Sequence, residues 1–188
     1  MDELFRQFDQ LCHNFAVQKI ETVGFTYMAA TGIKVVEDEM ENDFTKKNQV
    51  ERLLKMGIQM LDKAKSVSWG IKKDKRLNIK IGIHHGDVVI GVIGYHKPQF
   101  SLIGDTVNTT SRHCSTGEMG DITLSAVAYQ MLKRFSHSSF TKKQKEMKGL
   151  GMVNVYVYNN NDDMSSKHML IKIKFRNCVN KVIEKLRQ

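Results

Sequence analysis

The sequence has little of what marks secreted, metal-binding or membrane-spanning proteins. Its three cysteines, Cys12, Cys114 and Cys178, are widely spaced and odd in number, which fits neither a disulfide framework nor a zinc site. No apolar run approaches the length of a membrane span, and the first residues do not have the shape of a signal peptide. These absences favour a reducing, cytoplasmic compartment and predict no transmembrane segment in this chain.

The composition is that of a globular and basic protein. At 188 residues with 41% hydrophobic content, the chain is long enough for one domain and a short appendage. The formal charge of +9 favours an anionic partner, such as a nucleotide or an acidic surface. Basic and aromatic residues are not interleaved and no helix-turn-helix pattern is present, so the sequence predicts no nucleic-acid partner.

Hydrophobic periodicity predicts an α+β fold. Apolar residues recur at helical spacing over residues 1–15, 50–69 and 126–134, the last helix being capped by Ser125. Strands are expected at residues 17–22, 26–33, 77–84, 88–93, 100–103, 122–124, 140–147 and 152–158, with a loop at 34–48 and a basic turn at 72–76. Gly86-Asp87 is a common hairpin pair, which predicts that the strands on either side of it are partners.

The character of the chain changes after Tyr158. Residues 159–167 form a polar, low-complexity stretch, and residues 168–188 are basic with interspersed apolar residues. We therefore expect a domain at residues 1–158 and a linker with a basic tail at residues 159–188. The tail fits either a helix for a partner or membrane surface, or a loosely ordered segment outside the domain.

Residues 97–112, KPQFSLIGDTVNTTSR, look like a strand that turns sharply into a helix. Gly104 permits the turn because it has no Cβ, and the carboxylate of Asp105 is expected to act as the helix N-cap. Asn108 and Arg112 then fall one helical turn apart on the same face. An amide and a fixed cation in that arrangement suit a ribose and a phosphate, although a surface helix with two solvated side chains fits equally well.

Four stretches in order carry a family resemblance: KIETVGFTYMAATG at 19–32, KIGIHHGDVVIGVIG at 80–94, residues 97–112, and MKGLG at 147–151. They resemble the catalytic domain of class III nucleotidyl cyclases, the adenylyl and guanylyl cyclases, over about residues 5–158. Four motifs in register are far more specific than a lone glycine motif. The resemblance implies a ferredoxin-like α+β fold, an antiparallel-rich sheet flanked by helices, here without the family's first strand and part of its first helix.

The resemblance also implies a reaction and a site. Cyclases of this family bind a nucleoside triphosphate between two cyclase domains, and the ribose 3′-hydroxyl attacks the α-phosphate as pyrophosphate leaves. Asn108 matches the asparagine that orients the ribose, Arg112 the arginine that stabilises charge on the α-phosphate, and Lys148 the lysine that reaches the terminal phosphates. Leu150 stands where the family often has a second lysine, which makes this loop less basic.

Glu21 and Ser101 occupy the two positions that read the base. A carboxylate accepts from guanine N1–H and its 2-amino group, and a hydroxyl donates to O6, whereas adenine N1 would face Glu21 as a second acceptor. A mismatched buried donor or acceptor costs on the order of 1–3 kcal/mol. GTP is therefore expected rather than ATP, although guanylyl cyclases usually have cysteine where Ser101 stands. The alternative for Glu21 is an exposed carboxylate paired with a lysine such as Lys19.

Phe25 stands where a metal-binding member of the family has aspartate, and phenylalanine cannot bind a hard dication. The resemblance therefore implies the base-binding half of a pseudo-heterodimer. Mg²⁺ or Mn²⁺ would be held by a complementary metal-bearing cyclase domain, and this chain would be inactive alone. A non-catalytic regulatory or dimerisation domain and an adenylyl cyclase half stay open as alternatives. Similar guanylyl cyclases belong to large multispan proteins, which implies a location at the cytosolic face of a membrane.

Overall fold

The structure is a computed structural model that describes residues 2–33, 48–69, 75–133, 139–159 and 170–175. Its helices are α1 (Asp2–Asn14), α3 (Gln49–Ser66), α4 (Asp105–Thr116) and α5 (Ala126–Lys133). Its strands are β1 (Gln18–Val23), β2 (Thr26–Thr31), β3 (Ser68–Trp69), β4 (Lys75–Arg76), β5 (Lys80–His85), β6 (Val89–Ile93), β7 (Gln99–Ile103), β8 (Ile122–Ser125), β9 (Phe140–Met147), β10 (Gly151–Tyr158) and β11 (Leu170–Phe175). The expected helices and most of the expected strands are confirmed.

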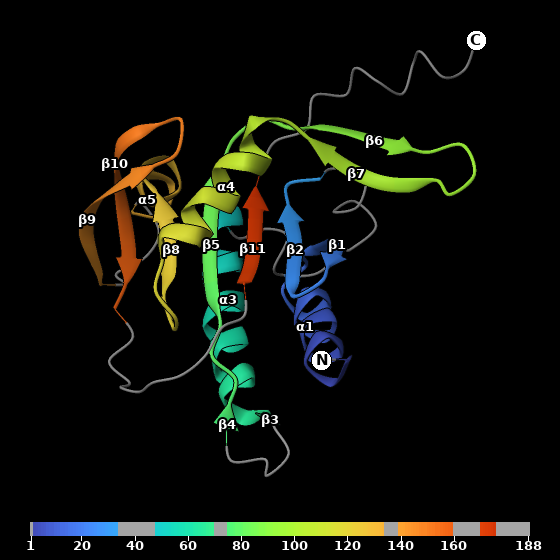
Figure 1. Ribbon diagram of the computed structural model, residues 1–188, viewed down its shortest axis with the longest axis horizontal. Helices are drawn as coiled ribbons and strands as arrows, with labels where there is room; N and C mark the ends of the chain where they lie inside the picture. The colour runs from blue at the N-terminus through green and yellow to red at the C-terminus, as the bar shows by residue number, and fades with distance from the viewer. Residues whose placement is uncertain (1, 34–47, 70–74, 134–138, 160–169, 176–188) are drawn as a thin grey trace.

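The main sheet has seven strands in the order β1-β2-β11-β5-β8-β10-β9 (Figure 1). β1 and β2 form an antiparallel hairpin, as do β9 and β10. β11 pairs in parallel with both β2 and β5, and β5 pairs in parallel with β8. The last described strand of the chain therefore lies in the middle of the sheet, between elements that come much earlier in the sequence.

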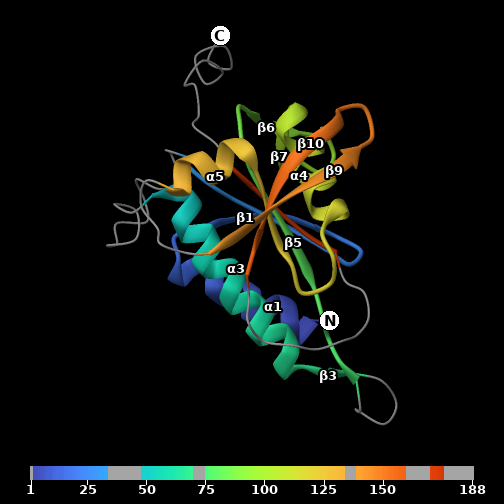
Figure 2. The ribbon, with the colours of Figure 1, turned by 90° about the vertical axis from the view of Figure 1, so that its left-hand side faces the viewer.

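The two faces of the sheet are covered differently. Helices α1, α3 and α5 lie on one face and α4 lies on the other (Figures 1 and 2). The main core sits beneath α1, α3 and α5, where the apolar stripes of the helices meet the alternate residues of the strands. Its fully buried members include Leu4, Phe8, Leu53, Met60, Ile81 and Leu124.

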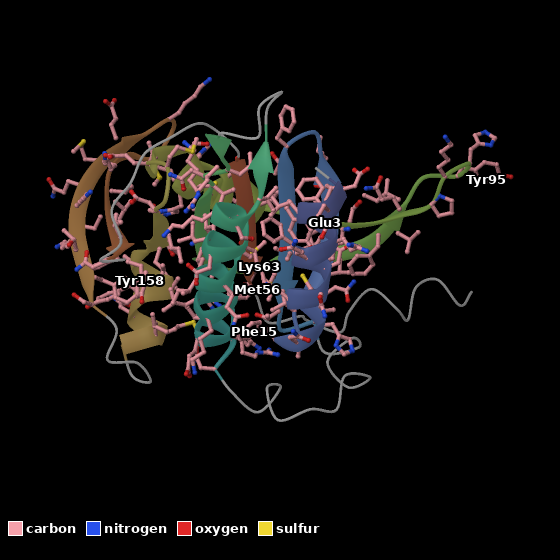
Figure 3. The ribbon with its side chains drawn as sticks, turned by 90° about the horizontal axis from the view of Figure 1, so that it is seen from below. Glu3, Phe15, Met56, Lys63, Tyr95 and Tyr158 are labelled. Carbon is pink, nitrogen blue, oxygen red and sulfur yellow. The ribbon has the colours of Figure 1, made fainter. Side chains whose placement is uncertain are left out.

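A separate two-stranded ribbon, β6 paired with β7, projects away from the main sheet (Figure 1). Its far end carries Tyr95, which is 94% exposed and lies at the extremity of the molecule in Figure 3. The expected pairing of the strands around Gly86-Asp87 is therefore wrong. β5 belongs to the main sheet and β6 turns away to pair with β7, because the inner strand β5 already has a partner on each side.

The entrance to α4 also corrects the sequence prediction. The N-cap position is Gly104, whose φ of 146° confirms the sharp turn, and Asp105 is the first helical residue. The carboxylate of Asp105 accepts from Thr109 Oγ1 at 3.1 Å rather than acting as the cap. The predicted cap of α5 is confirmed, since the Ala128 amide donates to Ser125 Oγ at 3.2 Å.

Within the tail, residues 170–175 form a strand, so for this segment neither of the two alternatives, a helix or a loosely ordered stretch, is correct. The predicted loop at 34–48 lies outside the described residues except for Asn48, whose side chain caps α3 by accepting from the amides of Val50 and Glu51. Most of the basic turn at 72–76 and of the linker at 159–167 is likewise outside the described residues. Across the described ranges, no helix combines the length and apolarity needed to cross a membrane.

Candidate functional site

Helix α4 positions two of the predicted site residues. One face of α4 is buried against the sheet through Thr106, Thr109, Thr110, His113 and Cys114. Asn108 is exposed and Arg112 is half-buried, and their spacing places both one turn apart on the side of the helix that is not packed on the sheet. Thr106 Oγ1 donates to the carbonyl oxygen of Asp87 at 2.6 Å, which ties the start of α4 to the segment between β5 and β6.

The turn between β9 and β10 meets α4 at Arg112. A Cβ placed on Gly149 would lie 3.6 to 3.7 Å from the two terminal guanidinium nitrogens of Arg112, so this guanidinium rests against the turn. The turn is closed by the Leu150 amide, which donates to the Met147 carbonyl at 2.9 Å. Lys148 is exposed on the same turn. The structure thus brings Arg112 and the loop of Lys148 together from segments that are far apart in the sequence.

The surroundings of this corner are cationic. Lys145, on β9, lies 3.9 Å from the carboxylate of Glu118, a long contact between partly exposed groups that leaves the lysine available to another anion. Lys80 Nζ donates to the carbonyl oxygens of Ser115 and Gly117 and so satisfies the last turn of α4. Arg112 and the neighbouring turn of Lys148 place cationic side chains at one corner, which can bind an anion such as a phosphate.

Glu21 and Ser101 come from two strands that lie side by side, β1 and β7. Gln99 Nε2 donates to Glu21 Oε2 at 3.4 Å, a contact that joins the strands. Gln99 and Ser101 are two residues apart on β7, so they share one face of that strand. The alternative pairing of Glu21 with Lys19 is not what the structure shows, since Lys19 Nζ pairs with Asp9 at 2.8 Å. Both Glu21 and Ser101 are half-buried.

The chain connects the two groups of residues directly. β7, with Ser101, runs into α4 through Gly104, so that Asn108 and Arg112 follow within the same continuous segment (Figure 1). Along this segment the order is the hydroxyl of Ser101, then the amide of Asn108, then the guanidinium of Arg112 beside the Lys148 turn. A hydroxyl, an amide and a guanidinium are groups that can form hydrogen bonds with polar and anionic ligands.

The two histidines His84 and His113 contribute to the packing of α4 on the sheet. The rings of His84 and His113 stack with centroids 5.9 Å apart, and His84 Nδ1 lies 2.9 Å from Ser125 Oγ. Burial, and secondarily the neighbouring His84, lowers the pKa of His113 from its ordinary value of 6.5 to about 4. His113 is therefore neutral at physiological pH and serves the packing of α4 on the sheet.

The position of the family's metal ligand does not fit a metal ion in this chain. Phe25 lies at the turn between β1 and β2 and is 67% exposed, with no oxygen to offer a hard cation. In the part of the chain that the structure describes, no three His, Cys, Asp or Glu side chains are grouped as a metal site would require. The donor set for a divalent metal is thus lacking among these residues.

Two features of the site were not found from the sequence. The first is the contact of Gln99 with Glu21. The position of Gln99 two residues before Ser101, on the same face of the strand, could have indicated it. The seating of Arg112 against Gly149 depends on a contact between α4 and the β9–β10 turn, which no local pattern indicates. Both features arise from tertiary packing of strands and helices that are distant in sequence.

Comparisons with known proteins agree with this arrangement. The sequence profile of the family described as the adenylate and guanylate cyclase catalytic domain matches residues 1–160. The chain is 33% identical over 157 residues to the receptor-type guanylate cyclase gcy-28 of Caenorhabditis elegans, a match that covers 83% of this chain and 12% of that protein. It is 31% identical over 156 residues to human guanylate cyclase soluble subunit beta-2, covering 83% of this chain and 24% of that protein. The chain thus spans a quarter or less of the length of these relatives.

Solved structures show the same fold. The guanylate cyclase domain of RhGC from Catenaria anguillulae, determined in complex with GTP, has a TM-score of 0.65 at 24% identity, covering 84% of this chain and 80% of that one. The adenylyl cyclase CyaB from P. aeruginosa has a TM-score of 0.58 at 16% identity, covering 87% and 83%. The expected α+β cyclase fold is confirmed, and this chain belongs to the adenylate and guanylate cyclase catalytic domain family.

Proposed function

We propose that this chain is the base-binding half of a guanylyl cyclase, which converts GTP to cyclic GMP and pyrophosphate once it is paired with a complementary, metal-bearing cyclase domain. The observation that carries the proposal is the seating of the Arg112 guanidinium against the Lys148 turn, with Asn108 one helical turn away. A structural partner has no physical need for an amide and two cations at these positions. We further propose the division of the chain into a catalytic domain at 1–158 and a linker with tail at 159–188.

In the proposed reaction the ribose 3′-hydroxyl gives its proton to water and its oxygen bonds to the α-phosphorus. The bond from that phosphorus to the bridging oxygen of the β-phosphate breaks, and pyrophosphate leaves. Asn108 orients the ribose, Arg112 stabilises negative charge on the α-phosphoryl oxygens, and Lys148 holds the terminal phosphates. Such catalysis rests on positioning and charge stabilisation, which these three side chains can supply from fixed elements.

The proposed base pocket selects guanine through Glu21 and Ser101. The carboxylate of Glu21 accepts from N1–H and the 2-amino group, and the Ser101 hydroxyl donates to O6. Gln99 supports this assignment, because its amide contacts one oxygen of Glu21 and holds the carboxylate beside β7. An adenine would place its N1 acceptor against the carboxylate and leave a buried group unsatisfied.

The partner domain would supply what this chain lacks. Divalent metal ions, Mg²⁺ or Mn²⁺, activate the attacking hydroxyl and neutralise phosphate charge in this chemistry. Phe25 offers no ligand, so we assign the metal to the complementary domain. Pairing is supported by the apolar surface of the β6–β7 ribbon and the β1–β2 turn, where Val92 and Phe25 are 68% and 67% exposed. We expect the isolated chain to be inactive.

The cellular setting is part of the same proposal. One relative is described as a receptor-type guanylate cyclase, and this chain spans 12% of its length. We propose that the chain acts at the cytosolic face of a membrane within a larger protein.

The test is to mix the purified chain with a metal-bearing cyclase domain and to measure cyclic GMP and cyclic AMP formation from GTP and ATP with Mg²⁺ or Mn²⁺. Arg112→Ala should reduce the rate roughly 10²- to 10³-fold, because it removes a cation that acts on developing charge. Lys63→Ala is the matched control, since Lys63 is an exposed lysine of α3, on the opposite side of the sheet from α4 (Figure 3). Activity that survives Arg112→Ala unchanged would remove Arg112 from the site.

A second experiment tests which base the proposed pocket selects. Glu21→Lys with Ser101→Asp should shift preference from GTP toward ATP, since it installs a donor and an acceptor matched to adenine. If GTP preference survives the double substitution, the pocket is not at these residues. ATP preference in the unchanged chain would favour the adenylyl cyclase alternative. GTP binding without turnover beside any metal-bearing partner would favour a regulatory domain.

A further inference from the structure

Strand β1 contains an irregularity between Lys19 and Glu21. In the pairing with β2, Lys19 lies opposite Ala29 and Glu21 lies opposite Met28, so two steps along β1 are matched by one step along β2. Such an offset is a β-bulge, and its extra residue is Ile20. In a regular strand Lys19 and Glu21 would share a face, because side chains alternate with a period of two. Since Ala29 and Met28 are neighbours on β2, the bulge places Lys19 and Glu21 on opposite faces of the sheet.

The contacts of the two side chains agree with this reversal. Lys19 faces α1, where its Nζ pairs with Asp9 Oδ2 at 2.8 Å and lies 5.4 Å from the centroid of the Tyr27 ring. Glu21 faces β7, where one carboxylate oxygen accepts from Gln99 Nε2 at 3.4 Å. The bulge therefore decides whether the Glu21 carboxylate is turned toward β7 or toward α1.

Asp9 holds the α1 side of the bulge with both of its carboxylate oxygens. One accepts from Lys19, and the other accepts from the Tyr27 hydroxyl at 2.6 Å. Tyr27 is fully buried beside the rings of Phe5 and Phe8, and this burial raises its pKa, so that the hydroxyl keeps its proton and donates. Asp9 thus links α1 to both strands of the β1–β2 hairpin (Figure 1).

We infer that Asp9 is a positioning residue for base selection, because it fixes Lys19 on the α1 side of the bulge and so keeps Glu21 turned toward β7. The inference rests on the proposed function, in which Glu21 binds guanine. A strand that slips by one residue turns its side chains to the other face, and the contacts of Asp9 oppose such a slip. The pair with the partly exposed Lys19 contributes little alone, whereas the hydrogen bond from the buried Tyr27 to a carboxylate is a strong one.

Disulfide trapping tests the direction of residue 21 without a catalytic assay. Glu21→Cys with Gln99→Cys should cross-link under a mild oxidant, because these side chains are in contact. Thr22→Cys with Gln99→Cys is the matched control and should not cross-link, since the next residue of β1 faces the other way. Adding Asp9→Ala to the first pair should slow its cross-linking by roughly tenfold, as measured by mass spectrometry. An unchanged rate would overturn the inference.

A comparison of two nucleotides tests base selection itself. The chain is assayed beside a metal-bearing partner with GTP and with inosine triphosphate, which lacks the 2-amino group that Glu21 is proposed to bind. Asp9→Ala should lower the ratio of kcat/KM for GTP over inosine triphosphate by about tenfold. A merely structural loss would reduce both rates equally and leave that ratio unchanged. Glu3→Ala is the matched control, because Glu3 is an exposed carboxylate of α1 whose partners Arg6 and Gln7 lie in the same helix.

A milder variant covers the case in which Asp9→Ala does not fold. Asp9→Asn keeps an acceptor for the Tyr27 hydroxyl but loses the charge that holds Lys19, so it should slow the cross-linking by about threefold. If the unmodified chain does not prefer GTP over inosine triphosphate, the proposed base pocket is wrong and base selection by Asp9 falls with it. If that preference is present but both Asp9 variants leave it and the cross-linking unchanged, the proposed function stands and this inference alone fails.

Discussion

The two faces of the main sheet differ in what covers them. Beneath α1, α3 and α5 the sheet meets a continuous apolar core, with Leu4, Phe8, Leu53 and Ile81 fully buried. Beneath α4 the buried side chains are mostly threonines, a histidine and a cysteine, and the outer side of α4 carries Asn108 and Arg112. Apolar burial stabilises the fold on the first face, whereas the second face presents polar groups at the surface, where we propose that they bind substrate.

This difference predicts that substitutions on the two faces act on different quantities. Removing apolar volume from the first face should lower the free energy of unfolding. Removing a polar side chain from the outside of α4 should change binding and turnover while leaving the free energy of unfolding nearly unchanged. The following substitutions test the contrast, in order of their expected effect on stability.

Phe8→Ala should have the largest effect, a loss of about 3–5 kcal/mol in the free energy of unfolding. Phe8 is 0% exposed and meets the ring of Tyr27 edge-on, with centroids 5.6 Å apart. Urea denaturation followed by circular dichroism measures the loss. Phe25→Ala is the control, since that ring is 67% exposed and its removal should change stability by less than about 0.5 kcal/mol. Equal effects for the two would contradict the assigned core.

Gly82→Ala tests how closely α4 approaches the sheet. The added Cβ would collide with the backbone of Cys114, which cannot move aside like a flexible side chain, so we expect a loss of about 1–3 kcal/mol. Gly91→Ala, in β6, is the matched control because a Cβ added there would have nothing within 4 Å of it. Thermal unfolding compares the two, and a neutral Gly82→Ala would mean that α4 does not rest on β5 as described.

The buried His113 of α4 predicts that the free energy of unfolding depends on pH. Its pKa is lowered to about 4 in the folded state, so the unfolded chain binds the proton more readily between pH 6.5 and 4. The contribution of His113 to the free energy of unfolding is fully present above pH 6.5. It is lost as the pH drops toward 4, by up to about 1.4 kcal/mol per pH unit. Urea midpoints at several pH values measure the slope. In His113→Gln this contribution disappears, and an identical slope in both proteins would refute it.

Arg112→Ala and Lys148→Ala should have the smallest effects on stability, less than about 1 kcal/mol each. Lys148 is exposed and Arg112 is half-buried against Gly149, so neither substitution opens a cavity in the core. The same proteins, assayed with a metal-bearing partner, should lose most of their activity. A large loss of stability in either variant would mean that these cations hold the fold, and the contrast between the faces would be lost.

Local patterns in the sequence predicted the helices and most strands, because hydrophobic periodicity and caps such as Ser125 depend on neighbouring residues only. The resemblance placed Asn108, Arg112, Lys148, Glu21 and Ser101, whose roles stay predictions. The pairing of β6 with β7 rather than with β5 was missed, because hairpin signals do not say whether a strand already has partners elsewhere. The capping role expected of Asp105 failed since Gly104 takes that position.

The sequence by itself determined that the chain is a cyclase catalytic domain with a strand, a sharp turn and a helix at residues 97–112. The cyclase assignment rests on the resemblance of four motifs to that family, and the strand, turn and helix rest on side-chain periodicity and a glycine, which are local. Only the tertiary structure decided that Arg112 rests on the Lys148 turn, that Gln99 contacts Glu21 and that β11 lies between β2 and β5. Contacts between segments distant in sequence depend on how sheets and helices pack, and no local pattern encodes them.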